Sequence, residues 1–184
     1  MTRFCLVRHA HAHWEPDENR PLSEAGQADA RRLADLLQVY PIERICSSPY
    51  RRARQTVEPL ARRLGLSIDI EPDLRERRLG DGPVRDFHAA VEMTWTDFAF
   101  IHPGGESNAA AQRRGVAVVR RLREQHPGEC IVLSTHGNLL ALLLHHFDPT
   151  VDFAFWQSLT MPDAYAFDVR PGRSVVIERL WPGE

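Results

Sequence analysis

Short runs of apolar residues alternate along this chain with segments whose apolar side chains recur at a helical period. The runs at 3–7, 42–46, 67–72 and 129–134 have the length and composition of buried strands. A repeat of strand and helix on this scale favours a mostly parallel sheet with helices on both faces. We therefore expect an α/β protein, specifically a three-layer α/β/α sandwich with a mostly parallel central sheet and an antiparallel edge strand.

Residues at the ends of the amphipathic segments predict where the helices begin and end. Ser23 is a typical N-cap for the first helix, whose pattern extends to about Tyr40. Ser48 and Pro49 are interpreted as the N-cap and first residue of the second helix, and Gly65 as its end. Further helices are predicted at 84–101, after the sequence PGGES at 103–107, and at 138–147.

The last part of the chain predicts two strands joined at Pro171 and Gly172, which would form the antiparallel edge of the sheet. No internal repeat, low-complexity tract or Gly/Ser linker interrupts the sequence, and 184 residues suit one domain with a sizeable core. We expect a single domain over residues 1–184, with a cover segment at about 80–105.

The charge balance excludes several classes of function. The chain has 23 basic and 25 acidic residues, a formal net charge of -2, and all of the basic residues are arginine. A near-neutral chain is not typical of a dedicated nucleic-acid or anionic-membrane binder. Without lysine, Schiff-base and P-loop lysine mechanisms are ruled out. Most of the arginines are explained by compositional bias, but some can serve as planar forks for phosphate or carboxylate.

The cysteines and the N-terminus indicate the compartment. Cys5, Cys46 and Cys130 are odd in number and lie in apolar runs, as reduced core residues do, so neither a disulfide framework nor a zinc site is expected. The apolar stretch at the N-terminus is too short for a signal-peptide core, and no run reaches membrane-spanning length. We expect a cytoplasmic protein with no membrane partner.

Polar residues follow the predicted strands directly. They are Arg8 and His9 after the first strand, Ser47, Ser48 and then Arg52 after the second, Glu76 after the third, and Thr135, His136 and Gly137 after the fourth. Ligands of an open parallel sheet bind beyond the carboxyl ends of its strands. We therefore expect two histidines, two arginines and one carboxylate to meet at one edge of the sheet.

This set of side chains suits phosphoryl transfer. A neutral imidazole at His9 can attack phosphorus if the charge of the phosphoryl group is spread over fixed donors. Arg8 and Arg52 each offer a planar fork, and His136 offers a further hydrogen bond. Glu76 can protonate the leaving oxygen and then deprotonate water. Since the arginines neutralise the charge, no metal or other cofactor is expected.

Five motifs occur in this order along the chain: LVRHAHAHW, SSPYRRARQT, LRERRLG, PGGES and STHGN. Together they resemble the motifs of the histidine phosphatases, also called the phosphoglycerate-mutase-like superfamily. The resemblance implies a small-molecule phosphatase in which His9 becomes phosphorylated. It further implies that Arg8, Arg52 and His136 bind the phosphoryl group and that Glu76 is the proton donor.

The chain departs from the pattern of that family beside the nucleophile. Ala10 and Ala12 stand where Gly and a hydroxyl residue are usual, and Glu15 stands where Asn is common. Because a carboxylate facing a phosphate is unfavourable, Glu15 is expected to turn away, to pair with an arginine, or to meet a cationic part of the substrate. The residues predicted at the rim of the site are His11, Glu15, Arg78 and Glu106.

Several questions stay open at this point. Asp73 or Asp81 could replace Glu76 as the acid, and His11 with His13 mimics the first ligand pair of metal-dependent phosphoesterases. Mutase-type phosphoryl transfer and a phosphate-binding protein without turnover are also compatible with the motifs. The mutases of the resembled family have longer chains with extra segments over the site, so hydrolysis is favoured. The partner is then a small-molecule phosphate ester, and a homodimer is compatible with the sequence.

Overall fold

The computed structural model describes residues 1–15, 17–82, 84–169 and 175–182. In these residues one sheet has the strand order β3-β2-β4-β1-β5-β6. Its strands are β1 (Thr2–Arg8), β2 (Ile42–Ser47), β3 (Ile68–Ile70), β4 (Cys130–Thr135), β5 (Asp163–Val169) and β6 (Ile177–Arg179). Strands β3, β2, β4 and β1 run parallel, whereas β5 and β6 pair antiparallel. The predicted mostly parallel sheet with an antiparallel edge is confirmed.

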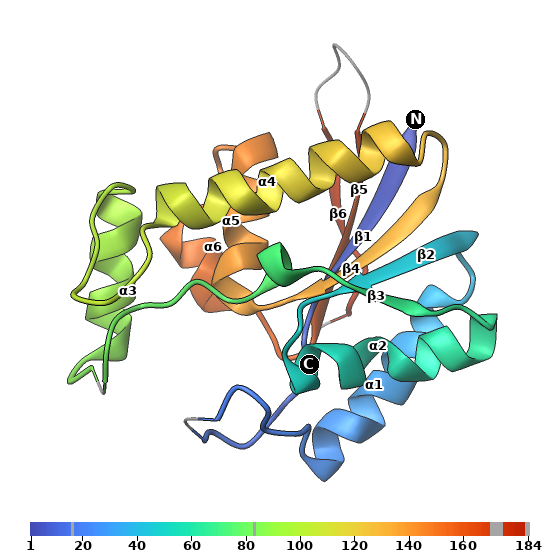
Figure 1. Cartoon of the computed structure of the whole chain (residues 1–184), viewed down its shortest axis with the longest axis horizontal. Coiled ribbons are helices and arrows are strands. Elements are labelled where there is room, and N and C mark those ends of the chain that lie inside the picture. Colours follow the sequence, from blue (N-terminus) through green and yellow to red (C-terminus); the bar gives the residue numbers. More distant parts are fainter. Residues whose placement is uncertain (16, 83, 170–174, 183–184) are drawn as a thin grey trace.

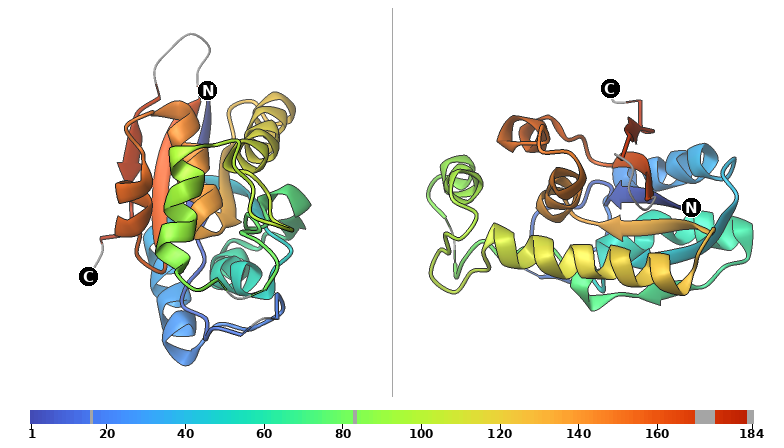
Figure 2. Two further views of the ribbon diagram at one scale, coloured as in Figure 1. Left: turned by 90° about the vertical axis from the view of Figure 1, so that its left-hand side faces the viewer. Right: turned by 90° about the horizontal axis from the view of Figure 1, so that it is seen from above.

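Helices cover both faces of this sheet (Figure 1). On one face lie α1 (Glu24–Leu37) and α2 (Arg51–Leu64), and on the other lie α4 (Asn108–Gln125) and α5 (Gly137–Phe147). Two shorter helices are α3 (Phe87–Thr96) and α6 (Phe153–Ser158), and a 3₁₀ turn, η1, spans Pro72–Leu74. Figures 1 and 2 show α3 at one end of the molecule, beside the start of α4.

Each face of the sheet has its own core because side chains alternate along a strand. In β1, Phe4 and Leu6 pack with residues of α4 and α5, whereas Cys5 and Val7 pack with residues of α1 and α2. All six residues of β4 are buried. This burial on both faces is typical of a central parallel strand and explains the continuous apolar run at 130–133.

The helix termini agree only in part with the prediction. Ser23 caps α1 as expected, its hydroxyl accepting a hydrogen bond from the Gly26 amide at 3.0 Å. Gly65 ends α2 with φ of 67°, a left-handed conformation that favours glycine. The predicted start of α2 at Ser48 and Pro49 is wrong, because the helix begins at Arg51. The Ser48 hydroxyl instead accepts from the Tyr50 amide at 3.3 Å, before the helix begins, and is hydrogen-bonded to the ring of His136 at 2.8 Å.

Two further differences concern the second half of the chain. The helix expected over 84–101 is confined to α3, and α6 was not predicted at all. The expected turn at Pro171 and Gly172 lies outside the described residues. None of the helices in the described part of the chain is long and apolar enough to cross a membrane.

Candidate active site

The carboxyl ends of β1, β2 and β4 lie side by side. Arg8 is opposite Thr135 in the β1–β4 ladder, and Ser47 is opposite Ser134 in the β2–β4 ladder. The pairing continues past the strands, since the His9 amide donates to the Thr135 carbonyl at 3.0 Å and the Ser48 amide to the Ser134 carbonyl at 2.9 Å. The residues that follow these three strands are therefore brought together at one edge of the sheet.

His9 is buried at this edge, with one ring nitrogen free of hydrogen. Its Nδ1 lies 2.8 Å from the Ala10 carbonyl oxygen, which can only accept, so Nδ1 carries the proton. The other nitrogen, Nε2, accepts a hydrogen bond from Arg52 Nε at 3.2 Å. Burial, followed by the positive charge of Arg52, lowers the pKa of His9 to about 3. The ring is therefore neutral, with a lone pair on Nε2.

His136 has the opposite tautomer. Its Nδ1 accepts from Arg52 Nη2 at 3.3 Å, and its Nε2 donates to the Ser48 hydroxyl at 2.8 Å. Its ring centroid lies 5.1 Å from that of His9, and the side chain is fully buried. Burial and the neighbouring His9 and Arg52 lower the pKa of His136 well below its usual value.

Arg52 joins the two histidines from the first turn of α2. In addition to its contacts with both rings, its Nη1 donates to the Glu18 carbonyl at 3.4 Å, and its guanidinium lies 4.8 Å from the centroid of the Tyr50 ring. The start of α2 is fixed by Thr56, whose hydroxyl donates to the Arg52 carbonyl at 2.7 Å and accepts from the Ala10 amide at 2.9 Å. Helix α2 is thereby held against the residues that follow β1.

Arg8 lies at the end of β1, and only one nitrogen of its guanidinium group donates hydrogen bonds to the described residues. Its Nη1 donates to the carbonyls of Leu159 and Thr160 at 2.9 and 3.1 Å. Its Nε is buried and has no hydrogen-bond partner in the part of the chain that the structure describes. A Cβ at Gly137 would lie 3.0 Å from this Nε, so glycine there allows the guanidinium to approach the start of α5.

Glu76 lies at the N-terminus of α5. Its Oε2 accepts from the Asn138 amide at 3.0 Å, and its Oε1 accepts from the amides of Leu139 and Arg77 at 3.0 and 2.8 Å. Unpaired N–H groups at a helix N-terminus favour an anion. The carboxylate is therefore fixed beside His136, the residue that precedes α5.

Two of these residues, Arg52 and Glu76, line a cavity of about 800 Å³. Of the four residues predicted at the rim, Glu15 and Arg78 line this cavity. His11 instead binds the Ser23 hydroxyl through its ring, and its carbonyl lies so close to Gly26 that a Cβ there would be 2.1 Å away. Glu106 pairs with Arg114 through two hydrogen bonds of 2.8 and 2.9 Å. His11 and Glu106 thus hold the structure around the site.

The cavity also includes residues that the sequence reasoning missed. Tyr50 bonds Glu18 through its hydroxyl at 2.8 Å, and Arg20 donates to the Glu15 carbonyl at 2.8 Å. Arg77 is buried in the cavity wall. Their only sequence signal is proximity to the motifs: Tyr50 lies between Ser48 and Arg52, and Arg77 directly follows Glu76. Among the described residues, no three His, Cys, Asp or Glu side chains are grouped so that they could hold a metal ion.

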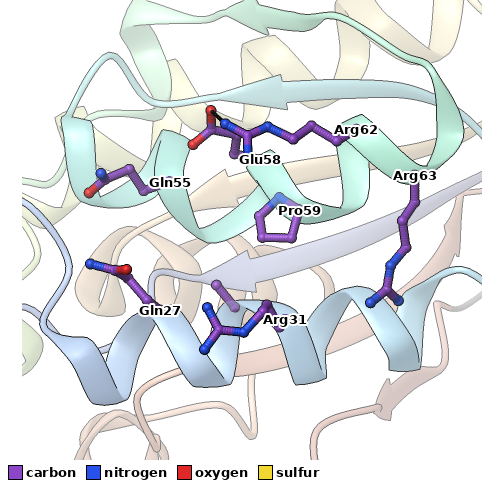
Figure 3. A pocket seen from close by; sticks show the side chains of 8 residues that line it. Gln27, Arg31, Gln55, Glu58, Pro59, Arg62 and Arg63 are labelled. Carbon is purple, nitrogen blue, oxygen red and sulfur yellow. Dashed lines mark hydrogen bonds and ion pairs between the residues drawn. The ribbon is translucent and has the colours of Figure 1, made fainter.

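A second hollow, of about 440 Å³, lies between α1 and α2 (Figure 3). It is lined by Gln27, Ala30, Arg31, Gln55, Glu58, Pro59, Arg62 and Arg63. Two of its arginines are neutralised by carboxylates, Arg62 by Glu58 and Arg63 by Asp35. The two residues of the strand-end site that line the larger cavity, Arg52 and Glu76, do not contribute to this hollow, so we treat it as a surface groove.

This α/β protein has an arginine and a neutral histidine at the end of β1, a pair that is chemically suited to bind and accept a phosphoryl group. Comparison with known protein families identifies the superfamily. Residues 4–173 match the model of the Histidine phosphatase superfamily (branch 1), and the chain belongs to this superfamily.

Similar proteins carry the names of phosphatases and of phosphoglycerate mutase-like proteins. Phosphoglycerate mutase-like protein 4 of Arabidopsis thaliana is 30% identical over 163 residues, which cover 79% of this chain and 70% of the relative. The uncharacterized phosphatase PhoE of Bacillus subtilis is 26% identical over 150 residues, covering 78% and 76%. The solved structure of a mycobacterial glucosyl-3-phosphoglycerate phosphatase with inorganic phosphate superposes with a TM-score of 0.77 at 25% identity, covering 96% and 94%. These findings support an enzyme that either hydrolyses phosphate esters or transfers phosphoryl groups.

Proposed function

We propose that this protein is a metal-independent phosphomonoesterase that hydrolyses a small-molecule phosphate ester through a phosphohistidine at His9. The observation that best supports this function is the neutral state of the His9 ring. The Ala10 carbonyl holds the proton on Nδ1, and burial beside Arg52 lowers the pKa of the ring to about 3. Nε2 therefore keeps its lone pair at neutral pH, as a nucleophile must.

In the first step, the Nε2 lone pair forms a bond to phosphorus while the bond between phosphorus and the ester oxygen breaks. The departing oxygen takes the proton that Glu76 carries on Oε2 in this step, which leaves the carboxylate that the three amide hydrogen bonds favour. Arg52 is suited to stabilise the transferring group because its Nε and Nη2 already face the ring nitrogens of His9 and His136. The buried Nε of Arg8 supplies another donor.

In the second step, water attacks the phosphorus of the phosphohistidine, and the bond between phosphorus and Nε2 breaks. Glu76, now a carboxylate, takes a proton from this water. Its Oε1 already accepts two hydrogen bonds and its Oε2 only one. A carboxylate oxygen has two lone pairs, so Oε2 keeps one position for the transferred proton.

Hydrolysis is favoured over mutase-type transfer because little of the chain is available to enclose an intermediate. The only helix between η1 and α4 in the described residues is α3, with ten residues. It is attached beside the site by a hydrogen bond of 3.0 Å from Trp95 Nε1 to Asn138 Oδ1. We propose the segment at about 80–105, which contains α3, as the cover of the site. A cytoplasmic location belongs to the same proposal and is supported by three buried cysteines without disulfides.

The test is hydrolysis of p-nitrophenyl phosphate by the wild-type protein with and without EDTA, together with His9→Ala. We expect equal rates with and without the chelator and no turnover in His9→Ala. His13→Ala is the matched control, since His13 is exposed whereas His9 is buried beside Arg52. Wild-type protein should also acquire an acid-labile phosphate that His9→Ala lacks.

Each competing function gives a different result in these assays. Loss of activity in EDTA would instead support a metal-dependent phosphoesterase. Binding of phosphate without turnover would support a phosphate-binding protein. Transfer of the phosphoryl group to an added alcohol or phosphoglycerate, faster than to water, would support mutase-type chemistry. Any of these results contradicts the proposed hydrolysis.

A further inference from the structure

Asp163 is a buried carboxylate at the start of β5, and both of its oxygens accept hydrogen bonds. The residue is 0% exposed. Its Oδ1 accepts from the Ala164 amide and from Arg179 Nε, both at 3.0 Å, and its Oδ2 accepts from the Thr160 amide at 3.0 Å and from Arg179 Nη2 at 2.8 Å. A buried ion pair is weak evidence for stability, because the lost hydration of both charges offsets much of their attraction. The energetics of this pair alone therefore do not explain why a carboxylate is buried here.

Asp163 lies beside Arg8 at the edge of the sheet where the strand-end site is formed. The two residues are opposite each other in the antiparallel β1–β5 ladder, so their side chains are on the same face of the sheet. Burial lowers the pKa of Arg8, and the negative charges of Glu76 and Asp163 oppose this shift. Within the described residues, the Arg8 guanidinium nevertheless donates to backbone carbonyls rather than to this carboxylate. Any influence of Asp163 on the position of Arg8 is therefore indirect.

One peptide unit connects the two side chains. Arg8 Nη1 donates to the Leu159 carbonyl at 2.9 Å, and the amide of the same peptide unit, that of Thr160, donates to Asp163 Oδ2 at 3.0 Å. A peptide unit is planar, so fixing the direction of its N–H group also fixes the direction of its carbonyl. Asp163 thereby orients a carbonyl that receives Arg8.

The segment that contains this peptide unit, residues 159–162, belongs to no helix or strand. Thr160 is held a second time through its hydroxyl, which donates to the Pro162 carbonyl at 2.7 Å and accepts from Arg179 Nη2 at 3.1 Å. The Thr160 carbonyl is the second acceptor of Arg8 Nη1, at 3.1 Å. Both acceptors of Arg8 thus depend on the hydrogen bonds that surround Thr160.

We propose that Asp163 is a positioning residue, which acts through the peptide unit between Leu159 and Thr160 to set the plane of the Arg8 guanidinium. Arg179 assists by holding the carboxylate with two hydrogen bonds. Because a guanidinium is planar, holding Nη1 in place also directs its remaining N–H groups. The inference rests on the proposed phosphatase function, in which Arg8 binds the phosphoryl group, and it adds residues of the antiparallel strands β5 and β6 to that site.

The test is a double-mutant cycle with Asp163→Asn and Arg8→Gln, measured as kcat/KM for p-nitrophenyl phosphate. Asp163→Asn keeps the shape of the side chain but removes its charge and one acceptor. In the wild-type background it should lower kcat/KM roughly 10- to 100-fold, because a charged hydrogen bond is weakened and the guanidinium is displaced. In the Arg8→Gln background the same replacement should lower kcat/KM less than about twofold, because its effect passes through Arg8.

Asp168→Asn is the matched control. Asp168 is on the same strand and opposite Arg3 in the same ladder, and it pairs with Arg3 Nε at 3.3 Å, but it lies at the end of β5 away from the site. Its replacement should leave kcat/KM within about twofold of the wild type, since it breaks an arginine pair without touching the segment that holds Arg8.

Arg179→Gln probes the same pair from its exposed side. It should lower kcat/KM in the wild-type background and have little effect in Arg8→Gln. A thermal unfolding curve for each variant shows that the rates are measured on folded protein. If Asp163→Asn does not fold, the same comparison with Arg179→Gln decides the proposal.

Two results would overturn the positioning role while leaving the phosphatase intact. One is a folded Asp163→Asn that keeps kcat/KM within about twofold of the wild type. The other is an equal fold-decrease in both backgrounds, which would show that Asp163 acts independently of Arg8, as a purely structural residue would. If the wild-type protein does not hydrolyse p-nitrophenyl phosphate, the proposed function fails. Calorimetric binding of inorganic phosphate to the four proteins of the cycle then decides the role, and an affinity that does not change in Asp163→Asn would refute it.

Discussion

Replacing Arg52 by lysine keeps the positive charge but removes the planar fork. Arg52 directs Nε to His9, Nη2 to His136 and Nη1 to the Glu18 carbonyl, at 3.2, 3.3 and 3.4 Å. A lysine ammonium is a single point charge at the end of a flexible chain. It can approach one of these acceptors but cannot bridge the two histidines. In the variant, the phosphoryl group would therefore no longer meet the two donors, Nε and Nη2, that face both rings.

The size of the effect follows from the hydrogen bonds that a lysine cannot make. Hydrogen bonds from a charged donor contribute about 1.5–3 kcal/mol each. The distances here are at the long end of the usual range, so we take the lower value for the two hydrogen bonds that the ammonium does not replace. The loss is about 3 kcal/mol, which corresponds to a decrease in kcat/KM of roughly 10²-fold.

The assay is kcat/KM for p-nitrophenyl phosphate in Arg52→Lys, with a thermal unfolding curve to show that the variant is folded. Arg62→Lys, on the same helix and exposed, is the matched control and should behave like the wild type. If a folded Arg52→Lys keeps kcat/KM within about threefold, charge alone is sufficient at this position. The reasoning from the fork geometry would then be refuted.

Three further predictions follow from the same site. Glu76→Gln should lower kcat/KM about 10²- to 10⁴-fold for an alkyl phosphate but much less for p-nitrophenyl phosphate, whose leaving group needs no proton; equal losses would assign the acid elsewhere. Gly137→Ala should lower kcat/KM about tenfold, because the added Cβ lies 3.0 Å from Arg8 Nε and displaces the guanidinium; an unchanged value would contradict the close approach. The pKa of His9 is about 3 in the fold and about 6.5 in the unfolded chain, so the unfolded chain binds more protons between these values. The free energy of unfolding, measured in urea, should therefore fall as the pH drops from about 6.5 toward 3, and His9→Asn should make this slope shallower; identical slopes would show that His9 does not titrate as proposed.

The sequence predicts the positions of the strand ends well because they depend on local pattern and on one topological rule. Arg8, His9 and His136 directly follow apolar runs, and parallel strands place such residues at one edge of the sheet. The ladder that sets Arg8 opposite Thr135 agrees with that expectation. The sandwich architecture could be predicted for the same reason.

Features that depend on interactions between distant residues could not be predicted. Ser48 has the sequence context of an N-cap, but its hydroxyl is bonded to His136, 88 residues away. His11 and Glu106 were expected at the rim, but they bond Ser23 and Arg114. Arg77 is next to Glu76 in a charged motif, and no local pattern indicates that it is the buried member. For Ser48, His11 and Glu106, the partner of the polar side chain, rather than its type, determines where the side chain lies.

All basic residues of the chain are arginines, so residue type alone does not separate surface charges from ligand-binding ones. The burial of each guanidinium and its pairing with a carboxylate do. Arg62 and Arg63 are exposed, and each pairs with a carboxylate. In the part of the chain that the structure describes, Arg8, Arg52 and Arg77 form no such ion pair, although Arg52 and Arg77 are buried. A buried guanidinium without a carboxylate destabilises the fold unless an anion offsets its charge. The cavity lined by Arg52 and Arg77 also holds Arg20, Arg75 and Arg78 against the carboxylates of Glu15, Glu18 and Glu76. A chain with a net charge of -2 thus has a local excess of positive charge in this cavity, which favours an anionic ligand.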